Sequence, residues 1–126
     1  MNKKAPSPSE MMTLQHLWER QTATIGELHR DICKSRKIGY TTVLKQIQRM
    51  EEKGFVERVS TTGRAHTFRA LYQPESTRRT LVQKLIKIAF DDSPNALIQH
   101  AIGEHNLSKG EIDEIRNLLD ALERDA

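Results

Sequence analysis

Several residue types and sequence features are scarce in this chain of 126 residues, and each scarcity narrows the range of functions. Cys33 is the single cysteine, so no disulfide can form within the chain, and a lone thiol fits a reducing compartment. No apolar run is long enough to cross a bilayer, and the first ten residues carry two lysines with no apolar stretch behind them. We therefore expect a soluble, cytoplasmic protein.

Motifs that carry chemistry are also missing. The sequence contains no glycine-rich phosphate loop, no nucleophile elbow and no paired catalytic carboxylates. Its five histidines show no metal-ligand spacing on one helix face, and His100 and His105, the nearest pair, are five positions apart. An enzyme is therefore the weakest hypothesis, and we expect neither a metal site nor a cofactor.

Charge is present in both signs but is unevenly distributed along the chain. Residues 1–72 hold 13 Lys and Arg against 7 Asp and Glu, a net charge of +6, whereas residues 73–126 hold 7 against 10, a net charge of −3. This asymmetry favours a basic nucleic-acid-binding module followed by a module with another task. Pro74 marks the change, and we predict two domains, a DNA-binding domain over residues 1–72 and a helical domain over residues 73–126.

Three helices are predicted in the first part of the chain. Capping boxes over residues 7–10 and 24–27 begin the first two, and the first of these should end near Arg20. The third is predicted over residues 40–53, between an N-cap at Gly39 and a left-handed C-cap at Gly54.

Two strand-like segments follow the third helix. Residues 55–60 and 65–71 have strand composition, and residues 61–64 have the composition of a hairpin tip. Helix, helix, helix and hairpin is the order of a winged helix-turn-helix domain, with the hairpin as a two-stranded wing. The predicted fold class is therefore mainly α, with a small β component in the first domain.

The helix predicted over residues 40–53 has two different faces. At about 100° per residue, Val43, Ile47 and Met50 fall on one stripe and the polar residues gather opposite it. Its first turns, the end that a recognition helix places against base edges, carry hydroxyls and a lysine. The candidate DNA-binding residues are Thr41, Thr42, Lys45, Gln48 and Arg49 on this helix, Lys37 in the turn before it, and Arg64 at the wing tip. The alternative for this stretch alone is an ordinary solvated helix face.

The second domain is predicted to contain three helices. They cover residues 75–90, a segment that starts at Ser93-Pro94, and a segment opened by a capping box over residues 108–111. About fifty residues cannot hide so much apolar surface alone, and a homodimer is the simplest remedy. The expected dimerisation residues are Leu81, Leu85, Ile88, Ile112, Ile115, Leu118 and Leu122.

Several short motifs, each present once, are spread along nearly the whole chain. They include Leu17-Trp18-Glu19, Tyr40-Thr41-Thr42-Val43, Lys53-Gly54-Phe55-Val56 and, near the end, Leu118-Leu119. In these motifs the sequence resembles the penicillinase-repressor (BlaI/MecI/CopY) family of bacterial winged-helix repressors. The resemblance implies a homodimer that binds inverted-repeat operator DNA through the recognition helix 40–53 and the wing 55–71. It also implies, as a further partner, a membrane-bound sensor or protease that acts as an antirepressor.

The sequence departs from this family at two functional features. Relatives in antibiotic-resistance systems are inactivated by cleavage of an Asn-Phe bond, and His100-Ala101 stands at the matching position here. Copper-sensing relatives end in paired cysteines, which this chain lacks. The inducing signal is therefore open.

A function of another class is also consistent with the pattern. A winged helix can act as a protein-interaction adaptor that does not read DNA, because a fold alone does not fix function. The hydroxyls and cations of the helix over residues 40–53 and the net charge of the first domain favour the repressor.

Overall fold

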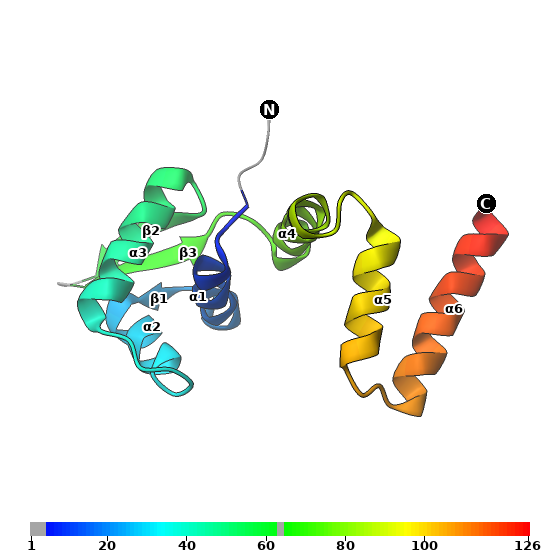
Figure 1. The fold of residues 1–126 in the computed structure, drawn as a ribbon. Coiled ribbons are helices and arrows are strands. Elements are labelled where there is room, and N and C mark those ends of the chain that lie inside the picture. Colours follow the sequence, from blue (N-terminus) through cyan, green and yellow to red (C-terminus); the bar gives the residue numbers. More distant parts are fainter. Residues whose placement is uncertain (1–4, 63–64) are drawn as a thin grey trace. The chain divides into compact units, whose positions relative to one another are not determined.

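Helices and a small sheet make up the first part of the chain, and helices alone make up the last part (Figure 1). The computed structural model describes residues 5–62 and 65–126. In chain order the elements are α1 (Pro8–Arg20), β1 (Ala23–Thr24), α2 (Ile25–Ile32), α3 (Tyr40–Lys53), β2 (Val56–Thr62), β3 (Ala65–Ala70), α4 (Pro74–Ala89), α5 (Pro94–Glu104) and α6 (Lys109–Asp125). The predicted fold class is confirmed, because a winged helix precedes a wholly helical segment.

The chain divides into two compact units, Met1–Lys84 and Leu85–Ala126, here called unit 1 and unit 2. Helix α4 begins in unit 1 and ends in unit 2. The division expected between residues 72 and 73 stays a prediction.

Helices begin and end where the local signals predict. Ser7 Oγ accepts a hydrogen bond from the backbone N–H of Glu10 (3.2 Å), and Glu10 Oε1 accepts one from the N–H of Ser7 (2.9 Å). Reciprocal pairs of the same kind open α2 and α6. Helix α3 ends at Gly54, whose φ of 82° lies in the left-handed region that glycine adopts without a Cβ penalty.

The sheet contains one strand that the sequence did not indicate. Its order is β1-β3-β2 with antiparallel pairing, and in the short β1 Ala23 pairs with Phe68. A strand of two residues is too short to show alternation, and Thr24 also serves as the N-cap of α2. The strands of the wing itself, β2 and β3, lie within two residues of the predicted bounds.

The core of unit 1 draws residues from every helix of the winged helix and from its sheet. The predicted stripe of Val43, Ile47 and Met50 is fully buried. The other members of the core cluster are Leu14, Leu17, Ala23, Ile25, Leu28, Ile32, Phe55, Val56 and Phe68. Each large aliphatic side chain buried in this way stabilises the fold by about 1.5–3 kcal/mol.

The start of α4 packs against this core. Trp18 is half-buried, and its Nε1 donates a hydrogen bond to the backbone carbonyl of Tyr72 (3.0 Å). Thr77 of α4 is buried and lines a cavity of about 20 Å³ together with Trp18 and Phe55. A volume of this size holds about one water molecule.

Unit 2 contains helices with almost no interior. No residue of α5 or α6 is buried. Helix α4 ends before Asp91 and Asp92, whose positive φ values (49° and 61°) are tolerated because short polar side chains can adopt the left-handed conformation. Phe90, before this break, and His100 on α5, after it, have ring centroids 5.9 Å apart.

Candidate nucleic-acid interface

One side of α3 presents most of the residues that the sequence selects for DNA binding. Thr41, Thr42, Lys45, Gln48 and Arg49 are all exposed, opposite the buried stripe of the same helix. Lys37, in the turn before α3, is exposed as well. Arg64 lies outside the residues that the structure describes. The structure therefore brings five of the seven candidates onto one helix face.

Several cations of unit 1 are paired with carboxylates, whereas those on this face have no such partner among the described residues. Arg20, Lys53, Arg58 and Arg69 each lie within salt-bridge distance of a carboxylate. Within residues 5–62 and 65–126, no carboxylate lies that close to Lys37, Lys45 or Arg49. These three charges are available to an anionic ligand such as a phosphate.

A groove runs between the first turn of α1 and one side of α3. On the α3 side it is lined by Thr42, Lys45, Gln46, Arg49 and Lys53, and on the α1 side by Ser7, Ser9 and Glu10. Sequence reasoning selected neither Gln46 nor the α1 residues. The helical repeat places Gln46 at the edge of the polar face, but only the tertiary structure reveals that α1 lies beside it.

The turn into α3 is fixed by a histidine rather than by a side-chain cap. Gly39 provides the N-cap backbone conformation without a side-chain hydrogen bond. His29 Nε2 lies 2.9 Å from the carbonyl oxygen of Ile38, and its ring meets that of Tyr40 edge to face with centroids 5.8 Å apart. These contacts hold the backbone immediately before the face that carries Thr41 and Thr42.

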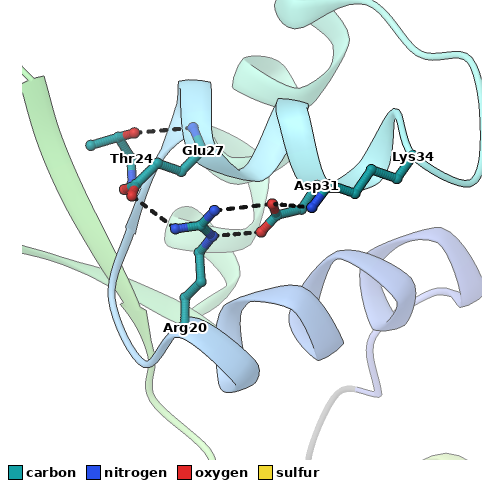
Figure 2. A network of polar contacts seen from close by, with 5 residues as sticks. All are labelled: Arg20, Thr24, Glu27, Asp31 and Lys34. Atoms are coloured by element: carbon teal, nitrogen blue, oxygen red, sulfur yellow. Dashed lines mark hydrogen bonds and ion pairs between the residues drawn. The ribbon is translucent and has the colours of Figure 1, made fainter.

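An arginine at the end of α1 holds α2 in place, as Figure 2 shows. Arg20 donates from Nε (2.5 Å) and Nη2 (3.0 Å) to the two carboxylate oxygens of Asp31, and from Nη1 to Glu27 (2.9 Å). Lys34 adds a longer contact of 4.0 Å to Asp31. The hydrogen bonds from Arg20 lower the pKa of Asp31, and the N–H of Thr24 lowers the pKa of Glu27. Because α2 leads directly into the turn before α3, this network fixes the frame of the helix-turn-helix.

A buried carboxylate links α1 to the far end of α3. Glu10 is 4% exposed, and Lys53 Nζ lies 3.1 Å from its Oε2. Burial opposes ionisation of Glu10, but hydrogen bonds from the N–H of Ser7 and from Lys53 outweigh it, so its pKa is lowered. Helix α3 is thus tied to α1 near its C-terminal end.

The base of the wing is tied to α3 by Arg58 of β2. Its guanidinium lies 3.6 Å from Glu51 of α3 and 5.6 Å from the ring centroid of Phe68. Glu57 and Arg69 form an ion pair across the two wing strands. His66, on β3, is exposed. The wing and α3 therefore keep a defined relation in unit 1.

A family model described as penicillinase repressor matches residues 6–121. The chain belongs to the penicillinase repressor family. The transcriptional regulator BlaI of Mycobacterium tuberculosis strain H37Rv is 27% identical over 116 residues, which cover 90% of this chain and 82% of that relative. The methicillin resistance regulatory protein MecI of Staphylococcus aureus strain N315 is 21% identical over 113 residues, covering 90% and 91%. The family resemblance predicted from the motifs is confirmed.

Solved structures support the same fold for this penicillinase-repressor chain. A mutant of MarR from E. coli, complexed with operator DNA, has a TM-score of 0.53 at 16% identity, and the match covers 93% of this chain and 75% of the MarR chain. Streptococcus pneumoniae FabT in complex with DNA has a TM-score of 0.50 at 18% identity, covering 94% and 74%. The family and its named relatives are transcriptional regulators rather than enzymes.

Among residues 5–62 and 65–126, no group of three or more His, Cys, Asp or Glu side chains is arranged to hold a metal ion. In that same part of the chain, no helix has the length and apolar character that crossing a membrane requires.

Proposed function

We propose that this chain is a homodimeric transcriptional repressor that binds inverted-repeat operator DNA. Helix α3 enters the major groove and the β2-β3 wing lies beside it. The observation that carries the proposal is the exposed face of α3, where Lys45 and Arg49 have no carboxylate partner among the described residues. Such a repressor works in the cytoplasm, where the bacterial chromosome lies.

The two ends of α3 suggest which residues read sequence. Thr41, Thr42 and Lys45 occupy the first turns, where side chains of a recognition helix reach base edges. Glu52 is exposed near the other end, and its carboxylate would repel phosphates. The helix therefore enters the groove with its N-terminal half.

The remaining candidates suit the DNA backbone. Arg49 stands one turn beyond Lys45, and Lys37 precedes the helix, so both can neutralise phosphates beside the groove. We assign Gln48 to the groove edge. Arg64 is assigned to the backbone or minor groove from its place in the sequence alone.

The dimer is proposed through the apolar residues of the last three helices. Leu85 is 45% exposed, Ile88 70%, Leu118 61% and Leu122 59%. The other proposed interface residues are Leu81, Ile112 and Ile115. Soluble monomers rarely expose so many large aliphatic side chains in so short a segment, and a second copy would cover them as a core cut in half.

The names of the related proteins, and the DNA bound in two structures of the same fold, support this function. The BlaI relative is named a transcriptional regulator and the MecI relative a regulatory protein of methicillin resistance. The MarR and FabT structures that share the fold were determined with DNA. We also keep as a proposal the membrane-bound sensor or protease implied by the family, although the cleavage pair is replaced by His100 and Ala101, which are exposed on α5.

A binding experiment on two kinds of DNA tests the proposal. Fluorescence anisotropy would compare binding to a duplex from the region upstream of the gene that encodes this chain with binding to a scrambled duplex, at two salt concentrations. Lys45→Ala should weaken operator binding by about 1–3 kcal/mol and scrambled binding much less. Arg49→Ala should weaken both and lower the salt slope by about one ion per protomer, which is about two for the proposed dimer. Lys109→Ala, which removes the same charge from an exposed site on α6, is the matched control and should change neither.

The outcome also separates the repressor from the adaptor. If the unmodified protein binds both duplexes equally weakly and Lys45→Ala changes neither affinity, the winged helix does not read DNA here. The adaptor hypothesis would then replace the repressor.

A further inference from the structure

Gln46 lies beside the DNA-facing residues of α3, but its amide is directed to α1. The hydroxyl of Thr13 donates a hydrogen bond to Gln46 Oε1 (2.5 Å). Gln46 Nε2 in turn donates to Ser9 Oγ (2.9 Å). Ser9 and Thr13 stand one turn apart on α1. The amide of Gln46 therefore bridges two successive turns of α1, accepting a hydrogen bond from one residue and donating one to the other.

The buried end of this bridge is the hydroxyl of Thr13, which is 0% exposed. Its single proton has two acceptors within reach, the carbonyl oxygen of Ser9 in its own helix (3.3 Å) and Gln46 Oε1 (2.5 Å), and the shorter contact is the one that joins α1 to α3. Arg36 Nη2 donates to Ser9 Oγ (3.4 Å), which brings the turn before α3 into the same network. Ser9 Oγ on α1 therefore accepts hydrogen bonds both from α3 and from the turn before α3.

The location of the bridge gives it a consequence for DNA reading. Gln46 follows Lys45 directly and lines the same groove as Thr42 and Arg49. The apolar contacts of α3 with the core are not directional, so they permit small rotations of the helix. Hydrogen bonds depend steeply on angle and distance, so they restrict such rotations. The amide thus restrains α3 near its middle, between Gly39 and the Lys53 contact.

We propose that Gln46 is a positioning residue, which through Thr13 and Ser9 sets the rotation of α3 on α1 and so the register of Lys45 and Thr42 on base edges. The inference rests on the proposed DNA-binding function. Base readout requires side chains held to within about half an ångström, whereas phosphate neutralisation tolerates displacement. The bridge therefore sustains discrimination between sequences more than general affinity for DNA.

A substitution of Thr13 can distinguish a positioning role of Gln46 from a direct contact between Gln46 and DNA. Glutamine can itself read adenine, so a Gln46 substitution alone is ambiguous. Thr13 is buried and cannot touch DNA, and Thr13→Val replaces its hydroxyl with a methyl group of similar size. The matched control is Thr77→Val, since Thr77 is also buried (6% exposed) but bonds to the carbonyl of Gln73 at the start of its own helix.

The experiment combines DNA binding with hydrogen exchange on the full-length protein. Thr13→Val and Gln46→Leu should each lower the operator-to-scrambled affinity ratio by about 5- to 10-fold, the value of one or two lost hydrogen bonds. The double variant should lower the ratio no further than the larger single change, because both act through one interaction. Thr13→Ser should restore most of the ratio, and the salt slope should not change.

Each contrary result overturns the proposal in its own way. An unchanged ratio in Thr13→Val, with only a lower melting temperature, would make the bridge purely structural. Loss of discrimination in Gln46→Leu but not in Thr13→Val would make Gln46 a direct base reader. Without DNA, exchange of the α3 amides should be faster in Thr13→Val than in Thr77→Val, and equal exchange would refute the restraint. This last readout decides the matter even if the unmodified protein shows no operator preference, a result that would refute the proposed function instead.

Discussion

Unit 1 buries Leu17, Leu28 and Ile47 completely, whereas unit 2 leaves Leu118 61% and Leu122 59% exposed. Both units use amphipathic helices, and both begin helices with capping boxes. The difference lies in what surrounds the apolar face. In unit 1 a sheet and further helices close over it, and in unit 2 the other helices of that unit leave it largely exposed. Local sequence signals are therefore sufficient for helices in both units, but only unit 1 contains a buried core.

The difference in burial between the two units suggests a different role for each. The core of unit 1 holds α3 and its neighbours in a fixed arrangement, which a reading surface requires. Unit 2, at about forty residues, is below the size at which a helical segment usually folds alone. The stability of unit 2 should therefore depend on a second copy of the chain. The distance between the two winged-helix domains of such a dimer should depend on the same contact. Changes in the two units should differ in kind as well as in size.

The largest effect is expected from truncation in the closed core. Leu28→Ala should lower the free energy of unfolding by about 2–5 kcal/mol at any protein concentration, because it removes contacts and leaves a cavity. Leu118→Ala, the same chemical change at an exposed site, should cost little in a monomer and should show a concentration-dependent loss instead. Chemical denaturation at two protein concentrations measures both. Equal, concentration-independent losses would show that unit 2 closes its own core.

An intermediate effect is expected from charge in the open face of unit 2. Leu118→Glu should convert the proposed dimer to a monomer and reduce operator affinity about 100-fold or more, since two linked half-sites bind far more tightly than one. Leu71→Glu is the matched control, because Leu71 is 43% exposed in unit 1. Sedimentation velocity and anisotropy on the same samples give both quantities. A compact monomer in the unmodified protein at micromolar concentration would contradict the proposed dimer.

The sequence predicted those features that depend on neighbouring residues. Capping boxes placed the starts of α1, α2 and α6, and Gly54 placed the end of α3. The exposed face of α3 followed from helical periodicity. These signals are local, so one sequence is sufficient to read them.

Features that join distant segments were not predictable in the same way. Strand β1 pairs with β3 through Ala23 and Phe68, more than forty positions apart. The bridge from Thr13 to Gln46 and the ion pair of Glu10 with Lys53 likewise depend on how α1 lies on α3. Nothing in the spacing of these residues reports their contact, because helical periodicity indicates which face is polar but not which element lies beside it.

The smallest effect, and the last test of the contrast, concerns the acid sensitivity of unit 1. Arg20 lowers the pKa of Asp31, so the folded state holds this carboxylate ionised more strongly than the unfolded chain does. Its contribution to stability is therefore fully present above the ordinary pKa of an aspartate, about 3.9, and is lost as the pH falls through the lower folded-state value. Asp31→Asn should cost about 0.5–1 kcal/mol at pH 7, and the difference from the unmodified protein should shrink below about pH 4. Asp120→Asn, at an exposed site on α6, should change stability by less than about 0.5 kcal/mol throughout. Urea unfolding between pH 7 and pH 3 would measure these differences, and a difference for Asp31→Asn that stayed constant with pH would mean that Arg20 stabilises α2 without relying on the charge of Asp31.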